Sequence, residues 1–267
     1  MEVGGALNAT MTGPSGAPVL VFVHGFGCGQ QMWRLVAPAF AQDFRVILLD
    51  LPGSAGSDPS TYDAERHSTL EGYADDILQV LRELAVDDVT FVGHSVASMM
   101  GVLAHLKEPS LVTRLVLVSP SARYVDDGDY RGGFSQADVD DLLAMMERNQ
   151  LGWQGALSGM VAGESHVAAR AELDDSFCRT RPDVALHFAT VTFTGDNRAD
   201  LPRVAAPTLI LQVRDDLIAP ISAGEYVHEQ IAGSRLQIIE TRGHAPHLTD
   251  PDAVVSAMRD FMPVGAA

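Results

Sequence analysis

Residues 91–101 read FVGHSVASMMG, and the interpretation of the whole chain starts from this stretch. It begins as the end of an apolar, β-branched run, and after Ser95 it continues as a segment that favours a helix. A strand can turn into a helix within so few residues only if the turning residue holds a strained backbone conformation beside small neighbours. Gly93 and Ala97 are small residues two positions on either side of Ser95. The pattern predicts a nucleophile elbow, which exposes the Ser95 hydroxyl at the end of a strand.

Strand-like and helix-like segments alternate on both sides of this stretch. Near-continuously apolar runs that alternate with helical spacing are typical of a parallel sheet covered by helices on both faces. The fold class is therefore expected to be α/β, with a mostly parallel, doubly wound sheet. The predicted strands are residues 18–23, 45–50, 89–92, 112–118, 207–213 and 236–239, and the predicted helices are residues 32–40, 73–84, 96–106, 221–231 and 251–262.

The alternation stops between residues 121 and 200, where only helical patterning is found. An all-helical insertion in an α/β chain usually lies over the carboxyl edge of the sheet, where ligands bind. A bundle packed elsewhere, with no role at the site, is the alternative. We expect a core of residues 1–120 and 201–267 and a helical cap, or lid, of residues 121–200. The candidate cap helices are residues 136–149, 153–161, 166–180 and 181–192.

Composition and charge exclude several classes of function. The 267 residues include 18 basic and 35 acidic side chains, and the net charge of −17 argues against nucleic acid or an anionic membrane as a partner. The longest apolar runs fall far short of the roughly 20 residues of a membrane span, and the first residues lack the pattern of a secretory signal. Cys28 and Cys178 give no disulfide framework, so we expect a cytoplasmic protein. The histidines do not fall at ligand spacings, so we expect neither a metal nor a cofactor.

A serine hydroxyl is a poor nucleophile at neutral pH and needs a base, which in turn needs an orienting acid. The loop after the last predicted strand carries His244, which is the predicted base, although a solvated surface histidine is the alternative. The loop after residues 207–213 carries two adjacent aspartates. The 28-residue spacing to His244 and a proline four residues on favour Asp216 as the acid, with Asp215 as the alternative. His94 and His247 are interpreted as structural or hydrogen-bonding residues.

The negative oxygen that develops during acyl transfer needs amide donors aimed at it. The N–H of Val96, the first amide after the predicted nucleophile, is one candidate. The HGFG loop at residues 24–27 offers the N–H of Phe26 as the second, because its glycines let the backbone approach a ligand closely. Together these residues predict serine acyl-transfer chemistry.

Further stretches extend the pattern over most of the chain. They are HGFG at 24–27, GHSV at 93–96, YRGGF at 130–134, MMERN at 145–149, RPD at 181–183, LILQ at 209–212, DDLIAP at 215–220 and RGHAPH at 242–247. In these stretches the chain resembles the α/β-hydrolase superfamily, and within it the RsbQ-type stress-signalling hydrolases and the related plant strigolactone and karrikin receptors. The resemblance implies a triad of Ser95, Asp216 and His244, with oxyanion amides at Phe26 and Val96. It also implies a cap of four helices over a hydrophobic cavity.

The pocket implied by this resemblance would take a small hydrophobic ligand that contains a carbonyl group. The residues expected to line it are Phe26, Tyr124, Trp153, Leu157, Val161, Phe177, Val191, Phe193 and Leu217. For those in the cap, packing between cap helices is the alternative. One expected function is hydrolysis of an ester or lactone through an acyl-enzyme at Ser95. The other is ligand sensing with output through a partner, which the bacterial relatives imply to be a PAS-domain phosphatase. Cofactor-free haloperoxidases and carbon–carbon bond hydrolases keep the serine and stay open.

Overall fold

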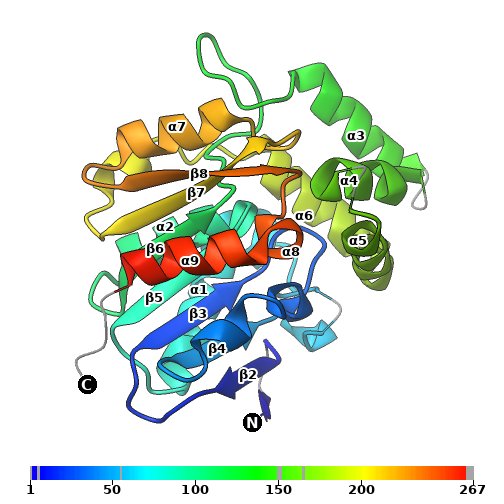
Figure 1. The fold of residues 1–267 in the computed structure, drawn as a ribbon. Helices are drawn as coiled ribbons and strands as arrows, with labels where there is room; N and C mark the ends of the chain where they lie inside the picture. The colour runs from blue at the N-terminus through cyan, green and yellow to red at the C-terminus, as the bar shows by residue number, and fades with distance from the viewer. Residues whose placement is uncertain (1, 5–6, 55, 149–151, 164–165, 263–267) are drawn as a thin grey trace.

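The computed structural model describes residues 2–4, 7–54, 56–148, 152–163 and 166–262. Its centre is an eight-stranded sheet in the order β1-β2-β4-β3-β5-β6-β7-β8 (Figure 1). The pairs from β4 to β8 are parallel, whereas β1 and β2 are antiparallel to their neighbours. The predicted mostly parallel sheet is confirmed. The strands are β1 (Glu2–Gly4), β2 (Ala9–Thr12), β3 (Val19–Val23), β4 (Arg45–Leu49), β5 (Val89–His94), β6 (Val112–Val118), β7 (Thr208–Asp215) and β8 (Arg235–Arg242).

Alternate residues of the strands contribute to two hydrophobic cores, because successive side chains of a strand point to opposite faces of the sheet. In β3, Val19, Val21 and Val23 belong to one core, and Leu20 and Phe22 belong to the other. The first core lies under α1, α2 and α7, and the second lies under α9 (Figure 1). These helices are α1 (Leu70–Glu83), α2 (Val96–Lys107), α7 (Ile221–Gln230) and α9 (Pro251–Phe261), and the short α8 (Pro246–Thr249) precedes α9.

The expectation of one helix over residues 32–40 is wrong. The chain forms two 3₁₀ turns there, η1 (Gln30–Trp33) and η2 (Ala37–Phe40). Their backbone hydrogen bonds join residues three apart, as in the bond from Val36 N–H to the carbonyl of Trp33. Pro38 contributes no N–H to continue an α-helical ladder, so the buried apolar side chains are presented by tight turns instead. Further 3₁₀ turns are η3 (Pro59–Thr61), η4 (Arg66–Ser68) and η5 (Leu201–Arg203).

Four helices between β6 and β7 lie together beyond the carboxyl ends of the strands (Figure 1). They are α3 (Gln136–Arg148), α4 (Gly152–Ala162), α5 (Val167–Arg179) and α6 (Pro182–Thr194), and we call them the cap. Asn149, the predicted last residue of the first cap helix, lies outside the described residues, and the domain boundaries at residues 121 and 200 stay a prediction. Within the described part of the chain, no helix is long and apolar enough to cross a membrane.

Candidate active site

The turn between β5 and α2 has the geometry of the predicted elbow. Ser95 lies between the last residue of the strand and the first of the helix, with φ 57° and ψ −125°. Residues other than glycine rarely adopt this backbone conformation. Its N–H donates to the carbonyl of Val118 at 2.8 Å, which ties the turn to β6. A Cβ atom at Gly93 would lie 2.5 Å from the carbonyl oxygen of Ala97, so only glycine fits there.

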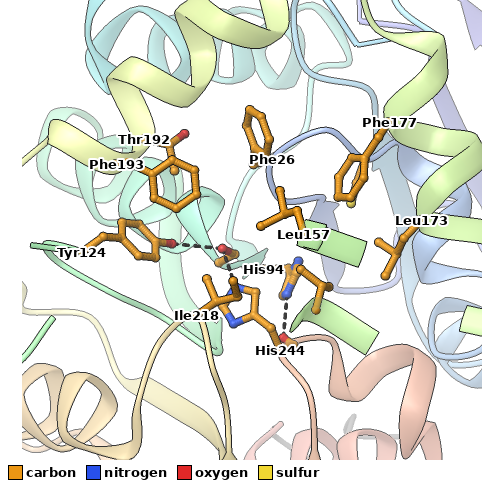
Figure 2. A pocket seen from close by; sticks show the side chains of 13 residues that line it. Phe26, His94, Tyr124, Leu157, Leu173, Phe177, Thr192, Phe193, Ile218 and His244 are labelled. Carbon is orange, nitrogen blue, oxygen red and sulfur yellow. Dashed lines mark hydrogen bonds between the residues drawn. The ribbon is translucent and has the colours of Figure 1, made fainter. Parts of the chain in front are cut away.

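The structure brings three of the predicted residues into one hydrogen-bonded relay. His244 Nε2 lies 2.7 Å from Ser95 Oγ, and His244 Nδ1 lies 2.7 Å from Asp216 Oδ2 (Figure 2 shows the first of these bonds). All three residues are buried, at 5%, 2% and 7% exposure in the order serine, histidine, aspartate. Because the carboxylate only accepts, Nδ1 carries the imidazole proton and Nε2 is left to accept from the serine hydroxyl. This arrangement has the protonation that a general base needs.

The choice between the two adjacent aspartates follows from where each side chain points. Asp216 turns inward, and its second oxygen Oδ1 accepts the N–H groups of Ile218 and Ala219 at 2.8 and 3.0 Å. Asp215 ends strand β7 with its side chain half exposed and pairs with Arg242 at 3.1 Å. Asp216 is therefore the carboxylate that contacts the imidazole, and its role as the catalytic acid stays a prediction.

The loop that carries His244 is held by bonds to the cap and to the elbow. The N–H of His244 donates to the carbonyl of Val161 in α4, and His94 Nε2–H donates to the carbonyl of His244 at 2.9 Å. A Cβ atom at Gly243, where φ is 92°, would lie 2.6 Å from the Val161 oxygen. The backbone on both sides of the imidazole is thus fixed, so the ring is oriented before any ligand arrives.

Three more histidines, which we call the histidine group, are buried around this loop. The group is His24, His94 and His247. Burial lowers the pKa of each of them, to about 3 for His247, and neighbouring imidazoles lower the pKa values of His94 and His247 further. The ring of His247 packs between the rings of Trp33 and His94 at centroid distances of 4.5 Å. These imidazoles are neutral near pH 7 and serve as packed parts of the frame. His24 and His94 also form hydrogen bonds to backbone groups.

The HGFG loop lies directly against the elbow. A Cβ atom at Gly25 would lie 3.2 Å from Ser95 Cβ and 2.7 Å from His94 Nδ1, so glycine is needed for this approach. The amide of Phe26 follows Gly25, and the amide of Val96 follows Ser95, which sets both backbone groups beside the serine. This placement suits the two predicted oxyanion donors, whose role stays a prediction.

Ser95 borders a narrow cavity with mainly apolar walls, which we call the front cavity (Figure 2). Tyr124 contributes one of its polar groups, a buried hydroxyl that lies 3.0 Å from Ser95 Oγ. Burial raises the pKa of Tyr124, so this hydroxyl stays protonated and able to donate. Six of the predicted pocket residues line the front cavity, namely Phe26, Tyr124, Leu157, Val161, Phe177 and Phe193.

Three predicted pocket residues lie outside the set that lines the front cavity. Trp153 packs behind it, with its ring 6.0 Å from the Phe26 ring and 5.4 Å from the Phe177 ring. Val191 lines a different hollow, beside the start of α1. Leu217 is 64% exposed, because the loop after β7 turns its side chain outward and that of Ile218 inward.

The sequence interpretation missed several residues of the wall. Ile218 follows the predicted Leu217, and Thr192 follows the predicted Val191. In each pair it is the second side chain that faces the front cavity. Leu173 comes from α5, whose helical pattern gave no reason to choose it. Cys28 lies just beyond the HGFG loop, and burial raises the pKa of its thiol to about 12. Among the described residues, no group of three or more His, Cys, Asp or Glu side chains is placed to hold a metal ion.

Comparison with known proteins agrees with the fold. The model of the α/β hydrolase fold family matches residues 18–251, which is most of the chain. The chain belongs to the α/β-hydrolase family. This α/β-hydrolase is 39% identical over 246 residues to a protein of Petunia hybrida named karrikin insensitive 2 receptor CA, with 91% of each chain covered.

Two further relatives of this α/β-hydrolase carry names of enzymes. A protein of Oryza sativa subsp. japonica that is named as a probable esterase is 38% identical over 255 residues, which cover 95% of this chain and 94% of the relative. The structure of a hydrolase from Oleispira antarctica matches with a TM-score of 0.93 at 36% identity, covering 96% of this chain and 94% of that one. Relatives named as receptors and relatives named as hydrolases thus share nearly the whole length of this chain.

Proposed function

We propose that this α/β-hydrolase is a serine hydrolase of small, hydrophobic esters or lactones. The observation that carries the proposal is the relay of Asp216, His244 and Ser95, with both hydrogen bonds at 2.7 Å. Ser95 and His244 line the front cavity. The mainly apolar walls favour a neutral, apolar ligand, and the narrow space favours a small one. The names of relatives that include esterases support the same reaction class.

The reaction follows from the protonation of the relay. Ser95 Oγ attacks the carbonyl carbon while its proton passes to His244 Nε2, and Asp216 stabilises the imidazolium that forms. The tetrahedral oxyanion accepts hydrogen bonds from the amides of Phe26 and Val96. Collapse breaks the carbon–oxygen bond, and the proton on Nε2 goes to the leaving alkoxide. A water then attacks the acyl-enzyme and loses a proton to His244 Nε2. When the bond between the acyl carbon and Ser95 Oγ breaks, that proton passes to Oγ, which releases the acid and regenerates Ser95. In a lactone, the alcohol and the acid leave as one molecule.

The direct test is hydrolysis of p-nitrophenyl acetate by Ser95→Ala. The substitution is expected to lower kcat by about 10⁴-fold or more, because the nucleophile is lost while the backbone frame remains. Ser222→Ala is the matched control, since Ser222 lies on α7, where its hydroxyl contacts the backbone of Arg131. Thermal melting of both variants checks that they are folded. Unchanged turnover in Ser95→Ala would refute the proposed mechanism.

Ligand sensing is the second candidate function, because several relatives are named as karrikin receptors. In this reading the relay binds or processes the ligand slowly, and the output is recruitment of a partner such as a PAS-domain phosphatase. The cap offers exposed apolar side chains for such a contact, with Val167 at 75% and Met145 at 42% exposure. Capture of a purified PAS-domain phosphatase, measured with and without a hydrophobic ester, tests it. Capture that is equal for wild type and for Val167→Asp with Met145→Asp would contradict a contact through the cap.

A further inference from the structure

The cap contacts the HGFG loop through a hydrogen bond as well as through apolar packing. Ser176 on α5 is 3% exposed, and its hydroxyl donates to the carbonyl of Gly27 at 2.9 Å. The next side chain, Phe177, lies so close to the loop that a Cβ atom at Gly27 would lie 2.3 Å from its ring. A buried hydroxyl of the cap is thus bound to the backbone of the loop that carries the predicted oxyanion amide of Phe26.

A turn in this loop extends the hydrogen bond along the backbone. The N–H of Cys28 donates to the carbonyl of Gly25 at 3.3 Å, which closes a turn of residues 25–28. Its third residue, Gly27, has φ 66°, in the left-handed region that favours glycine. The Gly27 carbonyl and the Cys28 N–H belong to one peptide group, and the Gly25 carbonyl and the Phe26 N–H belong to another. None of the described peptide bonds is cis, so in each group the N–H points away from the carbonyl.

The hydroxyl of Ser176 and these two peptide groups form a series of hydrogen bonds, which we call the donor chain. Ser176 donates to the first group, whose N–H on Cys28 donates to the second group, whose N–H on Phe26 is the predicted oxyanion donor. A hydrogen bond to the carbonyl of a peptide group polarises the group and strengthens its N–H as a donor. Fixing each carbonyl also fixes the direction of the N–H, and a donor that is oriented in advance is what stabilisation of an oxyanion needs.

The core supplies a second donor to the carbonyl of Gly25. His24 Nε2 accepts the N–H of Leu51 at 3.0 Å, so Nδ1 carries the proton and donates to the Gly25 carbonyl at 2.8 Å. Burial lowers the pKa of His24, so the ring stays neutral near pH 7. The loop has glycine at positions 25, 27 and 29, and such a backbone is free to adopt many conformations unless other groups hold it. The peptide group of the Phe26 amide is therefore held by the core directly and by the cap through the donor chain.

We propose that Ser176 is a positioning residue for the oxyanion hole, because its hydroxyl aligns the Phe26 amide through the donor chain. This inference rests on the proposed serine hydrolase reaction, and it adds that the cap takes part in the reaction as well as covering the front cavity. The negative oxygen forms in the transition state and is absent from the bound substrate. Loss of the alignment should therefore lower kcat and leave KM nearly unchanged.

Hydrolysis of p-nitrophenyl acetate by Ser176→Ala is the kinetic test. Removal of one neutral hydrogen bond is expected to lower kcat about fivefold and to change KM by less than about twofold. Ser158→Ala is the matched control, since Ser158 is also a buried serine of the cap, but its hydroxyl donates to the carbonyl of Gly155 on its own helix at 3.3 Å. Thermal melting checks that both variants are folded. Wild-type kcat in Ser176→Ala, or an equal loss in both variants, would overturn the proposal.

Two inhibitors of matched shape separate the alignment of the amide from the shape of the cavity. With 1,1,1-trifluorobutan-2-one, Ser95 Oγ bonds to the carbonyl carbon, the hydroxyl proton passes to His244 Nε2, and the ketone oxygen takes the negative charge. Butan-2-one binds without this addition. In Ser176→Ala the inhibition constant of the trifluoroketone is expected to rise about fivefold, and that of butan-2-one should stay the same. A residue that only shaped the cavity would change both constants alike, and that result would refute the positioning role.

Amide proton resonances give a readout that does not depend on turnover. Loss of the Ser176 hydroxyl should shift the amide protons of Cys28 and Phe26 upfield, because both peptide groups become less polarised, and Ser158→Ala should leave them in place. Unmoved resonances of Cys28 and Phe26 in Ser176→Ala would refute the donor chain. If the wild type does not hydrolyse p-nitrophenyl acetate, the proposed function fails, and these resonances alone decide whether Ser176 orients the Phe26 amide.

Discussion

Asp216→Asn is the sharpest test of the relay, because the structure dictates how the substituted side chain must sit. Oδ1 of Asp216 accepts two amides, from Ile218 at 2.8 Å and from Ala219 at 3.0 Å. Two N–H donors require an oxygen at that position, so the carboxamide keeps its oxygen there. Its NH₂ group then takes the place of Oδ2 and points at His244 Nδ1, 2.7 Å away.

A donor in that position reverses the tautomer of His244. Nδ1 must give up its proton to accept from the NH₂ group, and the proton moves to Nε2, which faces Ser95 Oγ. An Nε2 that carries a proton cannot take the one from Ser95. A histidine held in the wrong tautomer lowers turnover by about 10⁴-fold in a triad, which corresponds to about 5 kcal/mol of transition-state stabilisation at 1.36 kcal/mol per decade.

The adjacent Asp215→Asn is the matched control for this substitution. Asp215 is half exposed and pairs with Arg242 at the surface, so its loss should change kcat/KM for p-nitrophenyl acetate by less than about twofold. Both variants are compared at pH 7.5, after thermal melting has shown that they are folded. The reasoning is refuted if Asp216→Asn keeps more than a tenth of the wild-type kcat/KM, or if Asp215→Asn loses more than Asp216→Asn.

Three further predictions concern the frame around the relay. The histidine group is neutral in the folded state near pH 7 with pKa values below 6.5, so the unfolded chain binds more protons at lower pH. The free energy of unfolding should therefore fall by up to about 1.4 kcal/mol per pH unit for each imidazole as the pH drops below 6.5. In chemical denaturation between pH 7 and pH 5, His247→Leu should reduce the part of the slope due to this group by at least about a third, and an unchanged slope would contradict this. Gly25→Ala places a Cβ 3.2 Å from Ser95 Cβ and should lower kcat by about tenfold to a hundredfold in a folded protein, and wild-type kcat would count against the close approach. Tyr124→Phe removes one neutral hydrogen bond to Ser95 and should change kcat/KM by less than about tenfold, so a loss as large as that of Asp216→Asn would show a larger role for the hydroxyl.

The parallel sheet and the contacts of the relay could be predicted because they depend on local patterns and chain order. Buried strands read as apolar runs, and Gly93 and Ala97 mark the turn that only small residues permit. The loops after β7 and β8 end at the same edge of the sheet as the elbow, which is why residues more than 100 positions apart, Ser95 and His244, were expected to meet. The antiparallel β1 and β2 were missed, because strands of three and four residues give little periodicity.

The wall of the front cavity was harder to predict, because it depends on the direction of single side chains. Leu217 and Ile218 are both apolar, and only the turn after β7 decides that the second faces the cavity. Val191 and Thr192 are neighbours on α6, about 100° apart around the helix. Hydrophobicity favours Val191 as a wall residue, but its side chain faces a different hollow. Thr192 lines the cavity although its side chain is polar. The packing between helices decides which side chains face the cavity, and this packing depends on residues that are far apart in the sequence.

The positive φ of Ser95 exposes the reactive hydroxyl but lowers the stability of the fold. A side chain held in a sparsely populated region of backbone space destabilises the fold by about 1–3 kcal/mol, and glycine at the same place would relieve most of it. If the hydroxyl were no longer needed, the single substitution Ser95→Gly would therefore raise the free energy of unfolding. Serine at position 95 thus lowers the stability of the fold, and selection for the hydroxyl is what retains it.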